Sequence, residues 1–471
     1  MNSTSHTDSG DARESRLVRR EFLRNTGGAG LGMALASLLA ACGSSSKTSS
    51  ASAASGGRTP LLIWYWGEQE APGMQKFMEQ AVARYNAQQK RVKVTAVLQS
   101  SDTLYSAFAT AAQAGKGPDI QYLWGGTQAL VDVWLGYLAP LSDYIDESWL
   151  NANIPQGARS QTYWDGKQWG MPFYQIGTAL PYNKKLFRAA KLDPEQPPTT
   201  WSDFMAALEK LKGTGVSPIG LGFKDQFLGG WLISYFGQQN FNSIAEAIAP
   251  FKGGTAYAGP TYTEWISRVK DLVDNGFSNN DVLSINLYQG QNLFPTRKAA
   301  IVTSVQPQIT SFYRTMGGAD TVGVMLPPAF GTGTLARSFG VPAQVLLITK
   351  FSSHKEEAAE FLKFLHTPEM MQLMYKVSGA ITPDNKFDQA WLDTETDKTM
   401  LGWQKSLPDF WYQYYYPLQF ETNGVDPGLQ KLWEPNGSVA GAVSSMQSAI
   451  QQWKNQSPAQ AQAYSSWQLL A

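Results

Sequence analysis

The sequence predicts a globular α/β protein of two lobes, and three observations carry this prediction. The chain has 471 residues, 43% hydrophobic and 16% charged, which is enough for two domains with their own cores. Strand-like and helical patterns alternate between residues 60 and 124, which favours a largely parallel sheet with right-handed crossovers. The stretch Asp165–Asn183 combines a turn signal with an extended apolar run, which we interpret as the place where the chain enters a second lobe.

Five elements are expected in the first part of the globule. Their bounds follow from hydrophobic runs, from alternation in the strands and from helical spacing between them. They are a buried strand at Pro60–Trp66, a helix at Met74–Asn86, a strand at Val92–Leu98, a helix at Asp102–Ala114 and a strand at Ile120–Trp124.

The passage between the lobes begins with a predicted hairpin. Asp165-Gly166 is a strong signal for a tight two-residue turn, and aromatic residues flank it. Met171–Leu180 is extended and mostly apolar, and Tyr182–Phe187 turns it into a short helix. Because a cleft between two lobes is the usual place for a small ligand, we expect the binding site nearby.

Later segments show helical signals. Thr200 and Asp203 have the spacing of a helix cap before an apolar-periodic run. The stretch Lys355–Leu365 places its apolar residues on one face, which predicts an amphipathic helix. Beyond about residue 380 the chain is rich in Trp and Tyr, and Val439–Trp453 is again helical in pattern.

Composition argues against several classes of function. Lys plus Arg and Asp plus Glu both number 38, so net charge gives no drive towards nucleic acid. The chain has one cysteine, Cys42, and three histidines, none of them paired at metal-ligand spacing. It also lacks the short motifs of zinc proteases, serine hydrolases and P-loop proteins. We therefore predict no metal, no cofactor and no nucleic-acid partner.

The first sixty residues have the pattern of an export signal. The pair Arg19-Arg20 opens a stretch that resembles the twin-arginine motif, and Asn25–Ala41 is uncharged and too short to cross a bilayer comfortably. Leu39–Cys42 matches the bacterial lipobox, in which the cysteine is diacylated before cleavage.

From this pattern we expect residues 1–42 to be a twin-arginine-type lipoprotein signal with lipidation at Cys42, and residues 43–58 to be a flexible tether. The mature protein is then held by lipid on the extracytoplasmic face of the cell membrane. The alternative is a plain N-terminal membrane anchor with an incidental cysteine.

An ordered set of short motifs runs through the globule. It comprises the IWYWG and VKV strands, GPDI, the DGKQWGMP hairpin, ALPYNKKLF, PTTWSDF, the AAIV strand, FGVP and the helix that ends before Thr367-Pro368-Glu369. In this order the motifs resemble bacterial extracellular solute-binding proteins of the maltose-binding-like family, which serve sugar ABC transporters. The resemblance covers most of residues 60–450.

This resemblance implies a type II periplasmic-binding-protein-like fold, in which each lobe is a mostly parallel sheet flanked by helices and is discontinuous in sequence. The chain would cross between the lobes near Tyr174, Gly340 and Ile381. The expected bounds are 59–172 plus 341–380 for lobe 1 and 173–340 plus 381–471 for lobe 2. A protein of this family is expected to be a monomer that brings a small-molecule carbohydrate to the permease subunits of an ABC importer and catalyses no reaction.

A sugar site needs flat aromatic walls with polar side chains around them, because sugar rings have an apolar face and a rim of hydroxyls. In the first lobe, the resemblance implies that Glu68 and Gln69 make polar contacts with the ligand, and Trp66 beside them is also a candidate. Trp124 is the stacking candidate, and Asp102 a further polar one. The alternatives are a solvated loop with Trp66 in the core, core packing for Trp124 and helix capping for Asp102.

In the second lobe, the resemblance implies ligand contacts at the crossovers and after strand-like runs. They are Tyr174, Gln175, Asp225, Trp231, Gln306, Phe339 and Glu421. A helix cap is the alternative for Asp225, and core packing is the alternative for Trp231. Many relatives place a stacking Trp where this chain has Ser304-Val305-Gln306, which suggests either a more polar contact there or a ligand other than a linear glucan.

Two other functions remain open from the sequence. One is an exported carbohydrate-active hydrolase, which needs two carboxyl groups facing each other across a cleft. The other is the same binding fold for a non-sugar solute such as glycerol phosphate, which calls for basic side chains at the site. Only Lys224, Arg314 and Arg337 lie near candidate loops, which makes the phosphate ligand the weaker alternative.

Overall fold

The computed structural model describes residues 57–101, 103–225 and 227–468. The chain divides into the units Met1–Gly57 and Arg58–Ala471, and the helices and strands described here belong to the second unit. The predicted signal and Cys42 lie outside the described residues. Within the described part, no helix combines the length and apolar character needed to cross a membrane.

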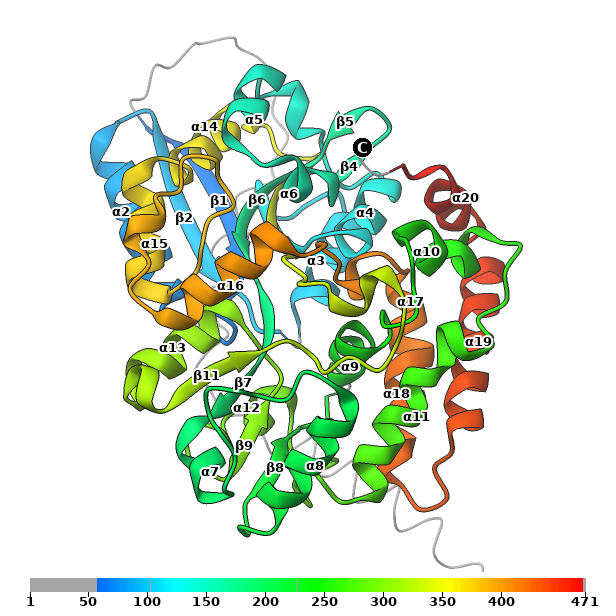
Figure 1. The fold of residues 1–471 in the computed structure, drawn as a ribbon. Coiled ribbons are helices and arrows are strands. Elements are labelled where there is room, and N and C mark those ends of the chain that lie inside the picture. The colour runs from blue at the N-terminus through cyan, green and yellow to red at the C-terminus, as the bar shows by residue number, and fades with distance from the viewer. Residues whose placement is uncertain (1–56, 102, 226, 469–471) are drawn as a thin grey trace, which may run out of the picture. The chain divides into compact units, whose positions relative to one another are not determined.

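The first sheet of the described residues has five strands in the order β2, β1, β3, β12, β6 (Figure 1). Their bounds are β1 Thr59–Tyr65, β2 Val92–Leu98, β3 Ile120–Trp124, β6 Gly170–Gln175 and β12 Ala343–Ile348. Strand β1 is parallel to β2 and β3, whereas β12 is antiparallel to β3 and β6. Helices α2 (Met74–Gln88) and α3 (Leu104–Gln113) alternate with the first three strands, as the sequence predicted.

One side of this sheet is covered by α2, α14 (Lys355–Leu365) and α15 (Pro368–Ser378), which pack against one another (Figure 1). The predicted amphipathic helix is confirmed with the same bounds, and it buries Ala358, Phe361 and Leu362. Burial of a side chain such as Leu or Phe contributes about 1.5–3 kcal/mol relative to exposure, so this face holds the helix on the sheet.

The second sheet is built around β7 (Thr178–Asn183). Strands β9 (Ala299–Val302), β10 (Ser304–Val305) and β11 (Val322–Met325) are antiparallel to β7, while β8 (Ser217–Gly220) is parallel to β9. This sheet is therefore less parallel than the sequence predicted. The antiparallel pairs all involve β7, which enters from the first sheet and runs opposite to β8, β9, β10 and β11.

Three segments of chain run between the sheets and are hydrogen-bonded to one another. The N–H of Ile176 donates to the carbonyl of Pro342 at 2.8 Å, and that of Thr178 to Gly340 at 3.0 Å. The N–H of Gln175 donates to the carbonyl of Ile381 at 2.9 Å. The passage from the first sheet to the second thus lies between β6 and β7, while the full lobe boundaries stay a prediction.

The predicted hairpin before this passage is confirmed. Strands β4 (Tyr163–Trp164) and β5 (Lys167–Gln168) pair in antiparallel fashion. Asp165 and Gly166 both have positive φ, 52° and 71°, as a tight two-residue turn requires.

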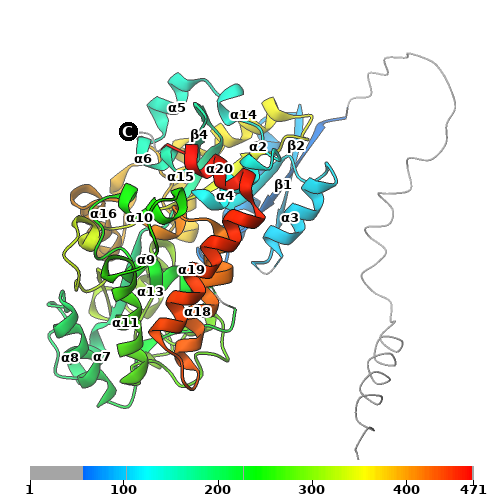
Figure 2. The same cartoon turned by 90° about the vertical axis from the view of Figure 1, so that its right-hand side faces the viewer.

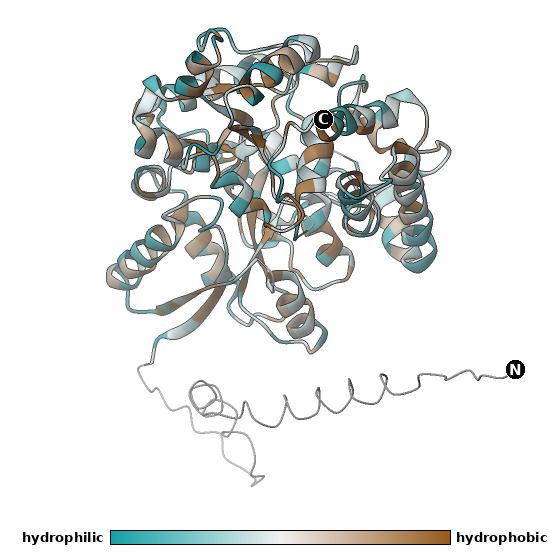
Figure 3. Cartoon of the chain, turned by 90° about the horizontal axis from the view of Figure 1, so that it is seen from below, coloured by the Kyte–Doolittle hydropathy of each residue, from teal (hydrophilic) through white to brown (hydrophobic). Residues whose placement is uncertain are grey.

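Further helices flank both sheets and form the C-terminal part (Figures 1 and 2). They are α4 Thr127–Trp134, α5 Glu147–Asn153, α6 Gln156–Ser160, α7 Lys184–Ala189, α8 Trp201–Lys212, α9 Leu228–Phe236, α10 Ile244–Lys252, α11 Pro260–Asp274, α12 Leu287–Gln291, α13 Gln306–Met316, α16 Glu395–Ser406, α17 Leu418–Phe420, α18 Asp426–Gln430, α19 Val439–Gln456 and α20 Pro458–Ser466. Helix α19 packs on α11, and α20 contacts both α10 and α4. Figure 3 shows hydrophobic residues gathered along the central strands.

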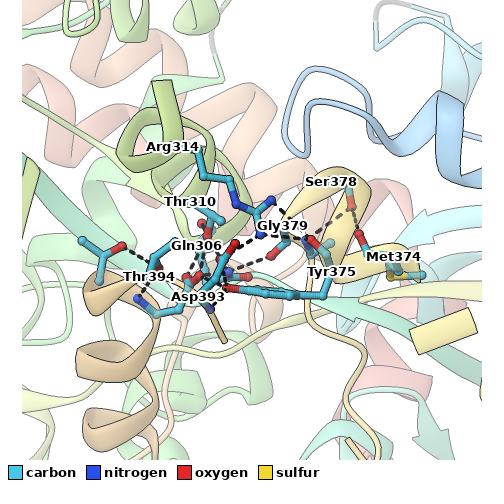
Figure 4. A network of polar contacts seen from close by, with 12 residues as sticks. Gln306, Thr310, Arg314, Met374, Tyr375, Ser378, Gly379, Asp393 and Thr394 are labelled. Carbon is cyan, nitrogen blue, oxygen red and sulfur yellow. Dashed lines mark hydrogen bonds and ion pairs between the residues drawn. The ribbon is translucent and has the colours of Figure 1, made fainter. Parts of the chain in front are cut away.

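A buried polar network joins α13, α15 and α16 (Figure 4). The carboxylate of Asp397 accepts hydrogen bonds from Gln306 Nε2 at 2.7 Å, Thr310 Oγ1 at 2.7 Å and the Tyr375 hydroxyl at 2.8 Å. Gln306 Nε2 also donates to the carbonyl of Gly379 at 2.8 Å. Burial raises the pKa of Asp397, because the charged form loses water, and these donors oppose the shift.

Removal of the Tyr375 hydroxyl should weaken this network. In Tyr375→Phe, the buried carboxylate of Asp397 loses one donor, so we expect the free energy of unfolding to fall by about 1–3 kcal/mol. Urea denaturation measures the change. Tyr313→Phe is the control, since that hydroxyl makes no hydrogen bond within the described residues. Equal stability of the two variants would contradict the role given to Tyr375.

Candidate binding site

A cavity of about 70 Å³ lies between elements of the two sheets. Its described lining contains seven aromatic residues, two glutamates and no Lys, Arg or His. The lining consists of Glu70, Ser101, Tyr105, Trp124, Gln128, Ile176, Phe227, Trp231, Leu287, Tyr288, Trp411, Gln413, Tyr414, Leu418 and Glu421.

The first wall belongs to the sheet of β1 and β3. Trp124 ends β3 and stacks on Tyr105 of α3, with ring centroids 5.0 Å apart and planes inclined by 28°. The Tyr105 hydroxyl donates to Gln128 Oε1 at 2.9 Å, which fixes the ring. Trp66 supports Trp124, with their centroids 5.2 Å apart, so the indole is held in one orientation.

The second wall is formed by two tryptophans from distant parts of the chain. Trp231 comes from α9, and Trp411 lies in the C-terminal segment. Their rings meet edge to face at 6.4 Å, and Trp411 meets Tyr235 in the same way at 5.3 Å. Edge-to-face pairs are a favourable arrangement of aromatic rings, so they hold Trp411 at the cavity.

Glu70 is a buried carboxyl group at the centre of a chain of hydrogen bonds. Its Oε2 accepts from the Tyr174 hydroxyl at 2.9 Å and from Gln344 Nε2 at 2.8 Å. Gln344 Oε1 in turn accepts from the hydroxyl of Tyr414, which also lines the cavity, at 2.9 Å. Burial raises the pKa of Glu70 to about 7, because the ionised form loses its contact with water. The hydrogen bonds from Tyr174 and Gln344 favour the ionised form and oppose this rise in pKa.

Glu421 is the second carboxyl group at the cavity. It is 3% exposed and accepts from Gln413 Nε2 at 2.9 Å and from the Tyr416 hydroxyl at 2.7 Å. Burial raises the pKa of Glu421 as well. Flat apolar rings and hydrogen-bonding carboxyl groups thus face the same small space, which suits a ligand with apolar faces and polar edges. In the described residues, no group of three His, Cys, Asp or Glu is placed to hold a metal ion.

Comparison with known proteins identifies the family. The family model described as bacterial extracellular solute-binding protein matches residues 67–372. The chain belongs to this family. The motif order in the sequence predicted this membership, and the two-sheet architecture is that of a type II periplasmic binding protein.

Individual relatives of this solute-binding protein are distant in sequence. A binding protein of Brucella abortus (strain 2308) is 25% identical over 361 residues, 76% of this chain and 84% of that protein. The sn-glycerol-3-phosphate-binding periplasmic protein of Agrobacterium fabrum is 25% identical over 310 residues, 63% of this chain and 68% of that protein. The solved chitin oligosaccharide binding protein has a TM-score of 0.74 at 21% identity, covering 84% of this chain and 98% of that one.

Three of the residues predicted from the sequence line the cavity together: Trp124, Trp231 and Glu421. The first comes from the first sheet and the other two from elements beside the second. Trp66 lies directly behind Trp124 and is 2% exposed. Tyr174 is also buried, and it contacts Glu70 instead of the cavity.

Other predicted residues have structural partners outside the described lining. The Glu68 carboxylate accepts from the N–H groups of Gly73 and Gln75 at the start of α2, and Gln69 accepts from Ser101 Oγ at 2.8 Å. Asp225 accepts from the N–H of Leu287 at 3.3 Å, at the start of α12. Their roles towards a ligand stay predictions.

The remaining predicted residues lie near the crossing segments. Gln175 pairs with Gln404 at 3.1 Å, and Gln306 belongs to the network around Asp397. Phe339 packs against Trp403, with centroids 5.5 Å apart. Asp102 lies outside the described residues.

Sequence reasoning did not select Glu70, Tyr105, Tyr288 or Tyr414. Glu70 directly follows Glu68 and Gln69, so the prediction chose the correct polar loop but not the residue of that loop that faces the cavity. Tyr105 and Tyr288 lie on helices whose orientation depends on tertiary packing. The signal for Tyr414 was the Tyr- and Trp-rich segment beyond residue 380, which has no periodicity that separates core from site.

The stability of the ligand-free protein should fall as pH rises. The raised pKa of Glu70 means that the folded state binds a proton more tightly than the unfolded chain does, so stability is lost between about pH 4.5 and 7. The free energy of unfolding should therefore fall between pH 5 and pH 8, and Glu70→Gln should remove on the order of 2–3 kcal/mol of this fall. Urea denaturation at both pH values measures it.

The control for this experiment is Glu209→Gln, an exposed position of α8. This variant should show the same dependence of the free energy of unfolding on pH as the original protein. A Glu70→Gln variant with an unchanged slope would show that Glu70 is ionised in the folded protein at pH 5.

Proposed function

We propose that this solute-binding protein captures a sugar or short oligosaccharide outside the cell and passes it to the permease of an ABC importer. The observation that carries the proposal is the cavity whose described lining includes seven aromatic side chains and two carboxyl groups. Aromatic faces pack against the C–H faces of sugar rings, and carboxyl groups accept hydrogen bonds from hydroxyls. The structural similarity to a chitin oligosaccharide binding protein is in keeping with such a ligand.

Binding in this proposal proceeds by closure. The cavity of about 70 Å³ has room for roughly five water molecules, which is too little for an oligosaccharide. The two walls therefore have to separate to admit the solute and then close on it, and a ligand that contacts both walls favours the closed form. The hydrogen-bonded crossing segments at Gln175, Gly340 and Ile381 are the natural place for this rotation.

Glycerol phosphate fits the cavity less well, although a relative is named for it. A phosphate ligand needs Arg or Lys donors, and none is in the described lining. Arg314 is paired with Asp393 at 3.0 Å, and Lys224 and Arg337 are exposed residues outside the lining.

A second candidate function is glycoside hydrolysis, and the presence of two carboxyl groups at one cavity, Glu70 and Glu421, favours it. Both have raised pKa values, as a general acid does. Release of reducing sugar from oligosaccharides, lost in Glu421→Gln, would establish this activity. We favour binding alone, because the family consists of binding proteins.

The proposed ligand should stabilise the protein in a way that depends on Trp231. We expect at least one saccharide of a panel to raise the midpoint of thermal unfolding, since it binds the folded state only. In Trp231→Ala the affinity should fall about 10- to 100-fold, because one aromatic wall is lost. Trp164→Ala in the β4–β5 hairpin is the control and should bind normally. Failure of every saccharide to shift the midpoint would reject the sugar ligand.

Lipid anchoring through Cys42 is a separate part of the proposal, supported by the lipobox sequence. In the native host, the protein should fractionate with membranes and incorporate radiolabelled palmitate. Cys42→Ser should abolish the labelling and release the protein or leave its precursor uncleaved. Labelling that persists in the variant would place the lipid elsewhere.

A further inference from the structure

Acidic side chains are concentrated around the cavity. Glu70, Asp132, Glu421 and Asp426 are each at least nine-tenths buried, although the whole chain has a net charge of zero. Glu70 and Glu421 line the cavity itself, and Asp132 lies on α4 one turn after the lining residue Gln128. Asp426 and Glu421 are close enough that the charge of Glu421 raises the pKa of Asp426, after the larger effect of burial.

These four carboxyl groups form no ion pair with a basic side chain of the described residues. Their polar contacts are neutral ones, such as those of Glu70 with Tyr174 and Gln344. A buried carboxylate without a counter-charge is costly, and an opposite charge brought within a few ångströms stabilises it. An incoming cation would supply this charge, whereas an anion would be repelled.

The aromatic residues of the cavity favour the same kind of ligand. Trp124 with Tyr105 forms one wall, and Trp231 with Trp411 forms the other. The faces of such rings attract an ammonium group, and the attraction is larger when water is excluded. Carboxyl groups and π-faces thus surround one small space, with no competing cation in its described lining.

We propose that the solute carries a protonated amino group that binds between Glu70 and Glu421, and that it is an amino saccharide. This inference rests on the proposed sugar-binding function and narrows it. The ammonium group donates charge-assisted hydrogen bonds to the two carboxylates, and the sugar ring packs on the tryptophans. Neutral saccharides of the same shape lack the charge and bind more weakly.

A pair of matched ligands tests the charge directly. The probes are the β-1,4-linked dimer of glucosamine and its N-acetylated counterpart, which share a backbone and differ in charge. Isothermal titration at pH 7 should show the glucosamine dimer binding at least about tenfold more tightly. Glu421→Gln and Glu70→Gln should each reduce that preference, whereas the exposed Glu209→Gln should keep it.

Two further probes separate this inference from the function on which it rests. Spermidine is a cation without a sugar ring, and glycerol 3-phosphate is an anion. Binding of spermidine without either saccharide would support the ammonium site and overturn the amino saccharide as its ligand. Equal or tighter binding of the N-acetylated dimer would overturn the inference and leave sugar binding intact.

The variants decide where the ammonium group lies. An unchanged preference for the glucosamine dimer in both Glu421→Gln and Glu70→Gln would overturn the inference. Tighter binding of glycerol 3-phosphate than of the cations would do the same. If the folded protein, checked by its cooperative unfolding, binds none of the four probes, the inference fails, whereas the proposed sugar ligand fails only if the wider saccharide panel is also without effect.

Discussion

The structure depends on one buried carboxyl group. Glu70 comes from the loop after β1 and is bonded to Tyr174 of β6 and Gln344 of β12, through which it reaches Tyr414 of the C-terminal segment. Four separate parts of the chain therefore meet at a group that is 2% exposed. A hydrogen bond within the protein contributes about 0.5–1.5 kcal/mol, and its loss leaves a desolvated partner. Glu70 thus links the cavity wall at Tyr414 to β6 and β12, the two strands next to the segments that cross between the sheets.

Much of the fold could be predicted because its signals are local. The bounds of β2, β3 and α14 follow from alternation, a short apolar run and helical spacing, none of which needs a distant partner. Strand directions in the second sheet could not be predicted in this way. The residues of β7 show that the segment is extended, but its antiparallel partners β9, β10 and β11 come from more than a hundred residues later.

The candidate site was predictable to a smaller extent, for a related reason. Trp124, Trp231 and Glu421 were selected because aromatic and acidic residues follow strands or match a family position, and they do line one cavity. Glu68 was selected for the same reason, yet its carboxylate caps α2, and it is Glu70 that faces inwards. Three polar residues in a row do not reveal which of them points to the core. That choice depends on Tyr174 and Gln344, which lie about 100 and 270 residues away.

The end of the chain adds a mechanical consequence. Helix α20 contacts α4, next to the first wall, and also α10. Just beyond it, the indole N–H of Trp467 donates to the carbonyl of Tyr163, and the Trp467 carbonyl accepts from Lys252 Nζ. This final segment therefore joins α10 to α4 and to the β4–β5 hairpin. A fusion partner or truncation at the carboxyl terminus would disturb these contacts, so a reporter domain for biosensing is better joined elsewhere.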